Sequence, residues 1–196
     1  MAIPDFAPHG ALPPFVEGDP ITASGRSPYT AEMQDFVERF CTTSHRAKLL
    51  RGLNAYRKHL FEGGFVSGYH WLDGSFVENV EATRSRPPRD IDVVTLFNRP
   101  IKYQANLASW AIDYPSQLHG QFFETRNMKP RYNCDTYAIN LDAESRALVR
   151  DTTYWFGLFS EMRGSTEKKG IVEIPLANDP MEFDAIDGQI GGKFSV

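Results

Sequence analysis

The segment Ile91–Phe97, IDVVTLF, constrains the fold of this chain more than any other stretch. It is a short, almost continuous apolar run that is rich in β-branched residues, and it ends at Asn98-Arg99-Pro100. A run of this kind, bounded by turn signals, is typical of a buried strand. The sequence therefore predicts a strand over 91–97 that is buried in the domain.

The rest of the chain predicts helices and strands in alternation around that strand. Apolar residues recur at helical spacing in the second helix, where Leu49, Leu53, Tyr56 and Leu60 form one stripe that ends before Gly63-Gly64. Helices are expected over 30–40, 44–62, 103–125 (with breaks) and 144–163, and strands over 65–72, 91–97, 131–141 and 168–176. This order predicts a mixed α/β (α+β) protein with few strands.

The two ends of the chain differ in amino-acid composition from its middle. Residues 1–29 contain six prolines, a density that forbids a regular helix, so we expect an extended arm whose LPPF stretch (12–15) lies across the body. Residues 30–180 are expected to form one domain. The acidic, glycine-containing segment 181–196 is expected to be a mobile tail.

Composition excludes several classes of function. The 196 residues carry a formal net charge of −4, so no global charge favours nucleic acid or an anionic membrane. No apolar run approaches the roughly 18 residues that a membrane span needs. Cys41 and Cys134 form no CxxC pair, and the N-terminus lacks the pattern of a signal peptide, so we expect free thiols in a soluble, cytoplasmic protein.

Two carboxylates stand at the start of the strand expected over 91–97. Asp90 and Asp92 are separated by Ile91, and residues i and i+2 of a strand face the same way. Like charges this close raise one another's pKa unless a cation neutralises them, and carboxylate oxygens favour Mg²⁺ or Mn²⁺. Asp135, which interrupts a later strand-like run, is the candidate for a third carboxylate of a two-metal site.

A Gly-Ser turn precedes the aspartates. Gly74 and Ser75 follow the expected strand that ends at Trp71-Leu72, and backbone N–H groups together with a hydroxyl at such a turn favour an anion. An anion cradle beside a metal-binding carboxylate pair is what phosphoryl and nucleotidyl transfer require.

The order of these features resembles the polymerase-β-type nucleotidyltransferase superfamily. Its pattern of a hydrophobic residue, Gly-Ser, a spacer and Asp-hydrophobic-Asp-hydrophobic is matched by Leu72-(Asp73)-Gly74-Ser75 and, after a fourteen-residue spacer, Asp90-Ile91-Asp92-Val93. LPPF, WLDGSF, RDIDVV and KKGIV together are similar to a short, uncharacterised bacterial family described as nucleotidyltransferase-like. The resemblance implies a small palm: a mixed, twisted sheet of about four or five strands with helices mainly on one face.

The resemblance also implies a role for each residue that matches. Asp90, Asp92 and Asp135 would hold the catalytic Mg²⁺ (or Mn²⁺), and Asp135 would activate the attacking hydroxyl. Gly74 and Ser75 would bind the triphosphate of the NTP, and a nucleoside monophosphate would pass to an acceptor. RNA or tRNA, a protein, or a second nucleotide are the acceptors implied, with a cognate antitoxin or an effector as a partner in toxin–antitoxin or antiphage defence settings.

Several residues keep two interpretations open. Lys169, in Lys168-Lys169-Gly170, is a candidate nucleotide-binding cation or an exposed basic turn before a strand. Phe76 follows Ser75 where the superfamily commonly has a basic residue, so a catalytically degenerate relative that binds nucleotide, RNA or a protein is the alternative function. The histidines show no zinc-binding spacing, and Trp155 is expected in the core rather than stacked on a base.

Overall fold

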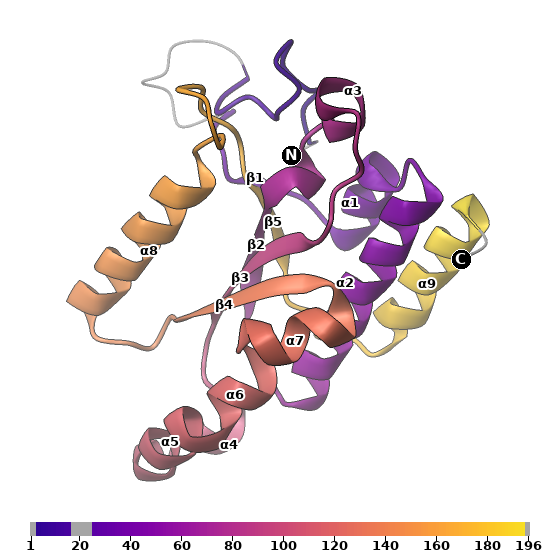
Figure 1. Cartoon of the computed structure of the whole chain (residues 1–196). Coiled ribbons are helices and arrows are strands. Elements are labelled where there is room, and N and C mark those ends of the chain that lie inside the picture. The colour runs from indigo at the N-terminus through magenta and orange to yellow at the C-terminus, as the bar shows by residue number, and fades with distance from the viewer. Residues whose placement is uncertain (1–2, 17–24, 195–196) are drawn as a thin grey trace.

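The computed structural model describes residues 3–16 and 25–194, which fold around one mixed five-stranded sheet (Figure 1). The strand order across the sheet is β1-β5-β2-β3-β4. β2 runs antiparallel to both β3 and β5, whereas β3 pairs with β4, and β1 with β5, in parallel. The strands are β1 (Tyr29–Thr30), β2 (Gly68–Asp73), β3 (Ile91–Phe97), β4 (Cys134–Asn140) and β5 (Val172–Pro175). The expected α/β class and the strand expected over 91–97 are confirmed.

Helices fill the connections between the strands. The helix expected over 44–62 has those bounds, because the Thr43 side chain caps its first turn by accepting from the Arg46 N–H and Gly63 ends it. The helical elements are α1 (Met33–Phe40), α2 (Ser44–Glu62), η1 (Gly74–Val77), α3 (Val80–Arg84), α4 (Ile101–Gln104), α5 (Leu107–Asp113), η2 (Tyr114–Leu118), α6 (His119–Phe122), α7 (Thr125–Tyr132), α8 (Ser145–Phe159) and α9 (Met181–Lys193).

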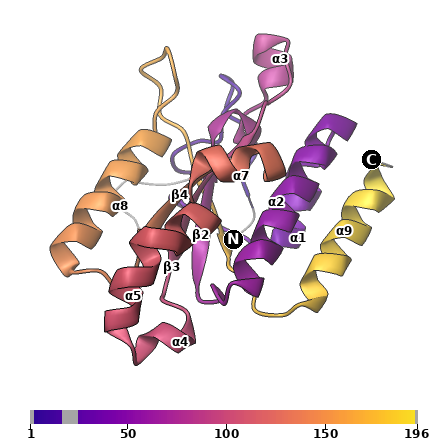
Figure 2. The ribbon, with the colours of Figure 1, turned by 60° about the horizontal axis from the view of Figure 1, so that its bottom comes forward.

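The two faces of the sheet are covered unequally. On β3, Ile91, Val93 and Phe97 point into the main core with α1, α2 and α9, whereas Val94 and Leu96 belong to a smaller cluster that Phe159 of α8 closes. Figure 2 shows α8 on one side of the sheet and α1, α2 and α9 on the other. Most of the helical cover therefore lies on one face, as expected, and α8 lies on the opposite face.

Three strands bring acidic residues to one end of the sheet. β2 ends where β3 and β4 begin, and the register pairs Asp73 with Asp92 and Asp92 with Asp135. Because successive side chains of a strand alternate between faces, these residues share the face of Val94 and Leu96. The acids thus project on the side of the sheet that α8 covers.

The N-terminal arm is packed against the body over the part that the structure describes. Leu12 is fully buried, its carbonyl accepts from the Gly170 N–H at 2.8 Å, and the Tyr29 hydroxyl donates to the Pro13 carbonyl at 2.6 Å. These contacts confirm that LPPF lies across the domain and hold it beside the segment that leads into β5.

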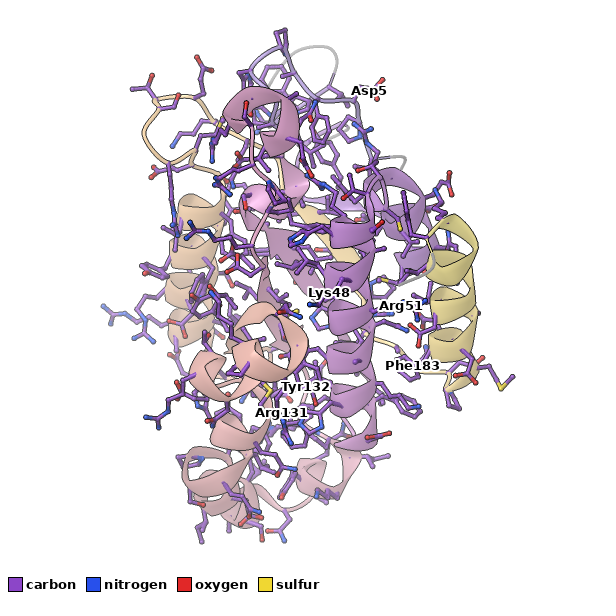
Figure 3. All side chains as sticks on the ribbon, turned by 45° about the vertical axis from the view of Figure 1, so that its right-hand side comes forward. Asp5, Lys48, Arg51, Arg131, Tyr132 and Phe183 are labelled. Atoms are coloured by element: carbon purple, nitrogen blue, oxygen red, sulfur yellow. The ribbon has the colours of Figure 1, made fainter. Side chains whose placement is uncertain are left out.

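The segment expected to be a mobile tail instead contains α9. Phe183, Ile186 and Ile190 are buried against α1 and α2, and Glu182 forms an ion pair with the buried Arg57 at 2.6 Å. Figure 3 shows Phe183 at the start of α9, between α9 and α2. Composition alone did not predict this helix, because acidic residues and glycines outnumber the three apolar residues of its buried stripe.

The third expected strand is shorter than predicted because a helix runs into it. Residues 131 and 132 belong to α7, and Asn133 adopts a left-handed conformation (φ 55°) that ends the helix and starts β4 at Cys134. Within the described residues, no helix is long and apolar enough to cross a membrane.

Candidate active site

The three aspartates singled out by the sequence lie together at the start of β3 and β4. A single cation joins two of them: the Lys129 ammonium of α7 lies 2.6 Å from Asp90 Oδ2 and 2.8 Å from each oxygen of Asp135. Burial lowers the pKa of Lys129, but the hydrogen bonds to Asp135 and Asp90 outweigh burial and leave the pKa above its ordinary value. The ion pairs therefore keep Lys129 charged.

Asp92 is the acid without a partner in this group. Within residues 3–16 and 25–194 its carboxylate has no hydrogen bond or ion pair. Asp90 lies two residues before it in the chain, and Asp135 is its register partner on β4. Burial, and then the charges of Asp90 and Asp135, raise the pKa of Asp92 to about 6, against a smaller opposing effect of Lys169 and Arg163. An additional cation would stabilise the ionised form of Asp92.

The Gly-Ser turn is built against Asp92. Gly74 has φ +77°, a left-handed conformation that favours glycine, and a Cβ atom there would collide with the Asp92 carboxylate. Ser75 lines the same cavity as the aspartates. The turn and the acids predicted from the sequence are therefore one site.

Lys169 lies beneath this turn rather than at its surface. Its side chain is 5% exposed. The ammonium lies 3.0 Å from Asp73 Oδ2, 3.1 Å from Glu78 Oε1 and 3.5 Å from the Gly74 carbonyl. Burial raises the pKa of Asp73 to about 7 despite Lys169 beside it. Lys169 thus links the residues before and after Gly74-Ser75 and fixes the shape of the turn.

The turn is also anchored from the core side. Phe76 is fully buried, with its ring 5.8 Å from that of Phe36 and 5.9 Å from that of Phe40. The buried Arg46 of α2 donates to the carbonyls of Phe76 and Glu78 and forms a forked ion pair with Glu81. An apolar residue at position 76 is therefore explained by packing, because its side chain faces the core and not the site.

The aspartates, the Gly-Ser turn and the two lysines line a cavity of about 880 Å³ on the α8 side of the sheet. Its charged lining consists of Asp73, Glu78, Asp90, Asp92, Asp135 and Glu161 together with Arg84, Arg86, Arg89, Lys129, Arg163 and Lys169. Acids thus gather at the strand ends, and arginines contributed by the loops on either side add positive charge to the same cavity.

One wall of the cavity is apolar and aromatic. Tyr137 of β4 and Trp155 of α8 have ring centroids 4.2 Å apart, and Trp155 lies 5.7 Å from Phe159. Trp155 was expected in the core, but it is only half-buried and faces the cavity. Flat side chains in such a position can stack on a planar ligand.

The donor chemistry of the site fits a hard divalent cation. Carboxylate oxygens from Asp90, Asp92 and Asp135 converge, and the cation they already attract is Lys129. Across the described ranges, however, no three acidic, histidine or cysteine side chains already surround a single point as metal ligands would. The Lys129 ammonium thus already holds two of the three carboxylates that a metal ion at this site would use.

Cys134 lies beside Asp135 but on the other face of β4. Its thiol is fully buried in the main core, and burial, followed by the charge of Asp135, raises its pKa. The thiol does not line the cavity, and a raised pKa disfavours the thiolate that a nucleophile needs.

Three features of the site were not predicted from the sequence: Lys129, the Asp73–Lys169–Glu78 cluster and the aromatic wall of Tyr137 and Trp155. Lys129 reaches the acids because the chain reverses at Asn133, and a left-handed residue of this kind carries only a weak sequence signal. Asp73 could have been found, since it precedes the Gly-Ser turn directly.

Comparisons with known proteins identify one family. Neither the curated proteins nor the solved structures gave a match. Residues 4–175 match a family described only as "Family of unknown function (DUF6932)", and the matched range contains the whole cavity described above but not α9. On this match, which covers most of the sequence, the chain belongs to the DUF6932 family of unknown function.

Proposed function

We propose that this protein is a metal-dependent nucleotidyltransferase of the polymerase-β type, which moves a nucleoside monophosphate from an NTP to an acceptor. One observation carries the proposal: Asp90, Asp92 and Asp135 line a single cavity together with Gly74 and Ser75. Asp135 lies sixty-one positions after Gly74 in the sequence, yet both line this cavity, which supports the resemblance to the superfamily pattern.

The proposed chemistry assigns each group a role. Asp90, Asp92 and Asp135 would hold Mg²⁺ or Mn²⁺, which supplies charge neutralisation at the transferring phosphoryl group. Asp135 would accept the proton of the acceptor hydroxyl as its oxygen forms a bond to the α-phosphorus. The bond from the α-phosphorus to the bridging oxygen breaks, and pyrophosphate leaves with that electron pair.

The cavity walls suit the rest of an NTP. Ser75 and the arginines of the cavity, among them Arg89 and Arg163, can donate to phosphate oxygens. Trp155 and Tyr137 offer a stacking surface for the base. Lys169, by contrast, would act on the nucleotide through the turn that it supports, because its ammonium is already held by Asp73 and Glu78.

The acceptor and the setting are further parts of the proposal. RNA or tRNA, a protein, or a second nucleotide each present a hydroxyl that can attack, and a cognate antitoxin or a defence effector would be the partner. Both cysteines are buried free thiols, which fits a reducing compartment, so we assign the activity to the cytoplasm.

A second candidate is a non-catalytic nucleotide-, RNA- or protein-binding partner with a degenerate site. One contact favours it: the Lys129 ammonium already pairs with Asp90 and Asp135. A site that never binds metal could retain this contact permanently.

The test is transfer of label from NTPs labelled at the α-phosphate. The protein is incubated with each NTP and Mg²⁺ or Mn²⁺, alone and with bulk tRNA, and the products are separated. We expect transfer by the wild type that is lost in the Asp90→Asn/Asp92→Asn double variant and kept in Asp35→Asn, a change at an exposed position of α1. Transfer that survives the double variant, or no transfer to any acceptor, would contradict the enzymatic proposal.

A further inference from the structure

Lys129 occupies the position that a metal ion would need. Its ammonium contacts Asp90 Oδ2 and both oxygens of Asp135, at 2.6 to 2.8 Å. These are two of the three carboxylates that the proposed function assigns to divalent cations. Two positive charges on the same oxygens repel one another, so the contact of Lys129 opposes the binding of a divalent cation to these two carboxylates.

The two lysines of the cavity are held very differently. Lys169 is 5% exposed and is enclosed by Asp73, Glu78 and the Gly74 carbonyl. The side chain of Lys129 is 45% exposed, and among the described residues its polar contacts are with Asp90 and Asp135 alone. A long, exposed side chain can leave its partners without disturbing the core, so Lys129 is free to move where Lys169 is not.

The backbone fixes where Lys129 starts from. Lys129 lies in the last turn of α7, and the left-handed Asn133 turns the chain back so that β4 begins beneath that turn. Lys129 and Asp135 are therefore only six residues apart and meet through a rigid reversal. Without metal, this arrangement places one positive charge among three carboxylates, which reduces their repulsion.

We propose that Lys129 is a built-in counter-ion that competes with the divalent metal and leaves Asp90 and Asp135 when the metal and a nucleotide bind. This inference rests on the proposed function. Once released, the ammonium is still on the wall of the cavity, where the phosphates of a nucleotide would offer it a new partner. Metal alone must displace Lys129 into water, whereas metal with NTP offers it a phosphate, so the two ligands bind cooperatively.

The direct test measures Mn²⁺ binding without nucleotide, from the electron paramagnetic resonance signal of free Mn²⁺. Lys129→Met keeps the length of the side chain and removes its charge, Lys129→Arg keeps the charge, and Lys102→Met is a matched control on α4, at the other end of β3. We expect Lys129→Met to bind Mn²⁺ at least about 10-fold more tightly than the wild type, and the other two variants to match the wild type. Equal or weaker binding by a folded Lys129→Met protein would overturn the inference.

Adding a non-hydrolysable NTP separates the two proposals. If the wild type binds Mn²⁺ with the nucleotide but Lys129→Met gains nothing for the metal alone, the counter-ion inference fails and the proposed function stands. If neither protein binds Mn²⁺ even with the nucleotide, both fail. A Kd for Mn²⁺ that does not tighten when the nucleotide is added to the wild type would also contradict the cooperativity.

A second measurement uses the wild-type fold, in case Lys129→Met does not fold. Lysines are reductively methylated with ¹³C, and the Lys129 signal is assigned by its absence from Lys129→Arg. We expect this signal to shift when Mg²⁺ and the non-hydrolysable NTP are added, while the signal of Lys102 stays in place. A Lys129 signal that does not move on nucleotide and metal binding would overturn the inference.

Discussion

At the scale of single residues, the site concentrates uncompensated negative charge. Lys129 neutralises part of the charge of Asp90 and Asp135, but the half-buried Asp92 beside them has no direct partner among the described residues. Charge of this kind costs stability in the absence of a ligand, and such costs are typical of sites that bind cations. Removing one of these charges should therefore raise the stability of the metal-free protein while lowering its activity.

Asp92→Asn should stabilise the metal-free protein while abolishing nucleotidyl transfer. Because the pKa of Asp92 is raised to about 6 from 3.8, the folded state holds this proton more tightly than the unfolded state. The contribution of Asp92 to stability is therefore present below about pH 4 and is lost as the pH rises to about 6. We expect the variant to exceed the wild type by roughly 2 kcal/mol at pH 7.5, and to match it near pH 4.

Urea unfolding in EDTA at both pH values measures this difference, and the comparison with the wild type cancels the titrating groups that lie far from Asp92. Asp73 contributes to the measured difference, because the charge of Asp92 raises its pKa. An Asp92→Asn protein that is less stable than the wild type at pH 7.5 would show that the charge of Asp92 is already compensated.

Gly74→Ala should disrupt the site where the turn meets Asp92. The left-handed φ of +77° costs alanine about 1 kcal/mol, and the new Cβ collides with the Asp92 carboxylate, so we expect a loss of about 2–4 kcal/mol and no measurable NTP binding. Gly188→Ala is the control, since it lies in α9 with open space around it, and should be neutral or slightly stabilising. Normal NTP binding by Gly74→Ala would mean that the turn does not contact the nucleotide.

At the scale of elements, buried cations tie the short segment after β2 to the body. Arg46 of α2 binds η1 and α3 through the carbonyls of Phe76 and Glu78 and the carboxylate of Glu81, and Lys169 binds Asp73 and Glu78 from the other side. The Gly-Ser turn is thus fixed at both ends by groups that do not touch the nucleotide in the proposed mechanism.

Arg46→Lys should therefore weaken NTP binding from outside the cavity. An ammonium cannot reproduce the forked contacts of the guanidinium, so we expect a loss of about 2 kcal/mol of stability and a several-fold weaker affinity for NTP. Arg150→Lys, an exposed position on α8 that pairs with Asp151, serves as the control and should change neither quantity. An unchanged affinity in Arg46→Lys would show that the turn keeps its shape without Arg46.

At the scale of the whole molecule, the two faces of the sheet have separate tasks. The face under α1, α2 and α9 holds most of the core, whereas the face under α8 carries the cavity at its acidic end. No described residue of α9 lines the cavity. Damage to the main core should consequently lower stability without altering the site.

Phe183→Ala tests this separation. Removing a phenyl ring that is 3% exposed and packs 5.6 Å from the ring of Phe61 should cost about 3 kcal/mol and lower the melting temperature by roughly 10 °C. Below that temperature, NTP affinity should equal that of the wild type. Met181→Ala, an exposed change at the start of the same helix, should alter neither quantity. A matching loss of NTP affinity in Phe183→Ala would indicate that the two faces are coupled.

The parts of the fold that follow a local pattern could be predicted from the sequence. β3 and the bounds of α2 depend on residues close in sequence. The same holds for the convergence of Asp90 and Asp92 with the Gly-Ser turn. Lys129 and the buried cluster around Lys169 depend on a left-handed reversal at Asn133 and on pairing between distant strands. α9 was missed because only tertiary packing distinguishes its narrow apolar stripe from a polar tail.

The central claim is that the acids and the Gly-Ser turn form one metal–nucleotide site, and calorimetric titration with a non-hydrolysable NTP tests it most directly. Titrations are run on the wild type and on Asp92→Asn, each with Mg²⁺ and with EDTA. We predict saturable binding to the wild type that requires Mg²⁺, and at least about 10-fold weaker binding to folded Asp92→Asn. Binding of equal strength with EDTA, or in Asp92→Asn, would contradict the account.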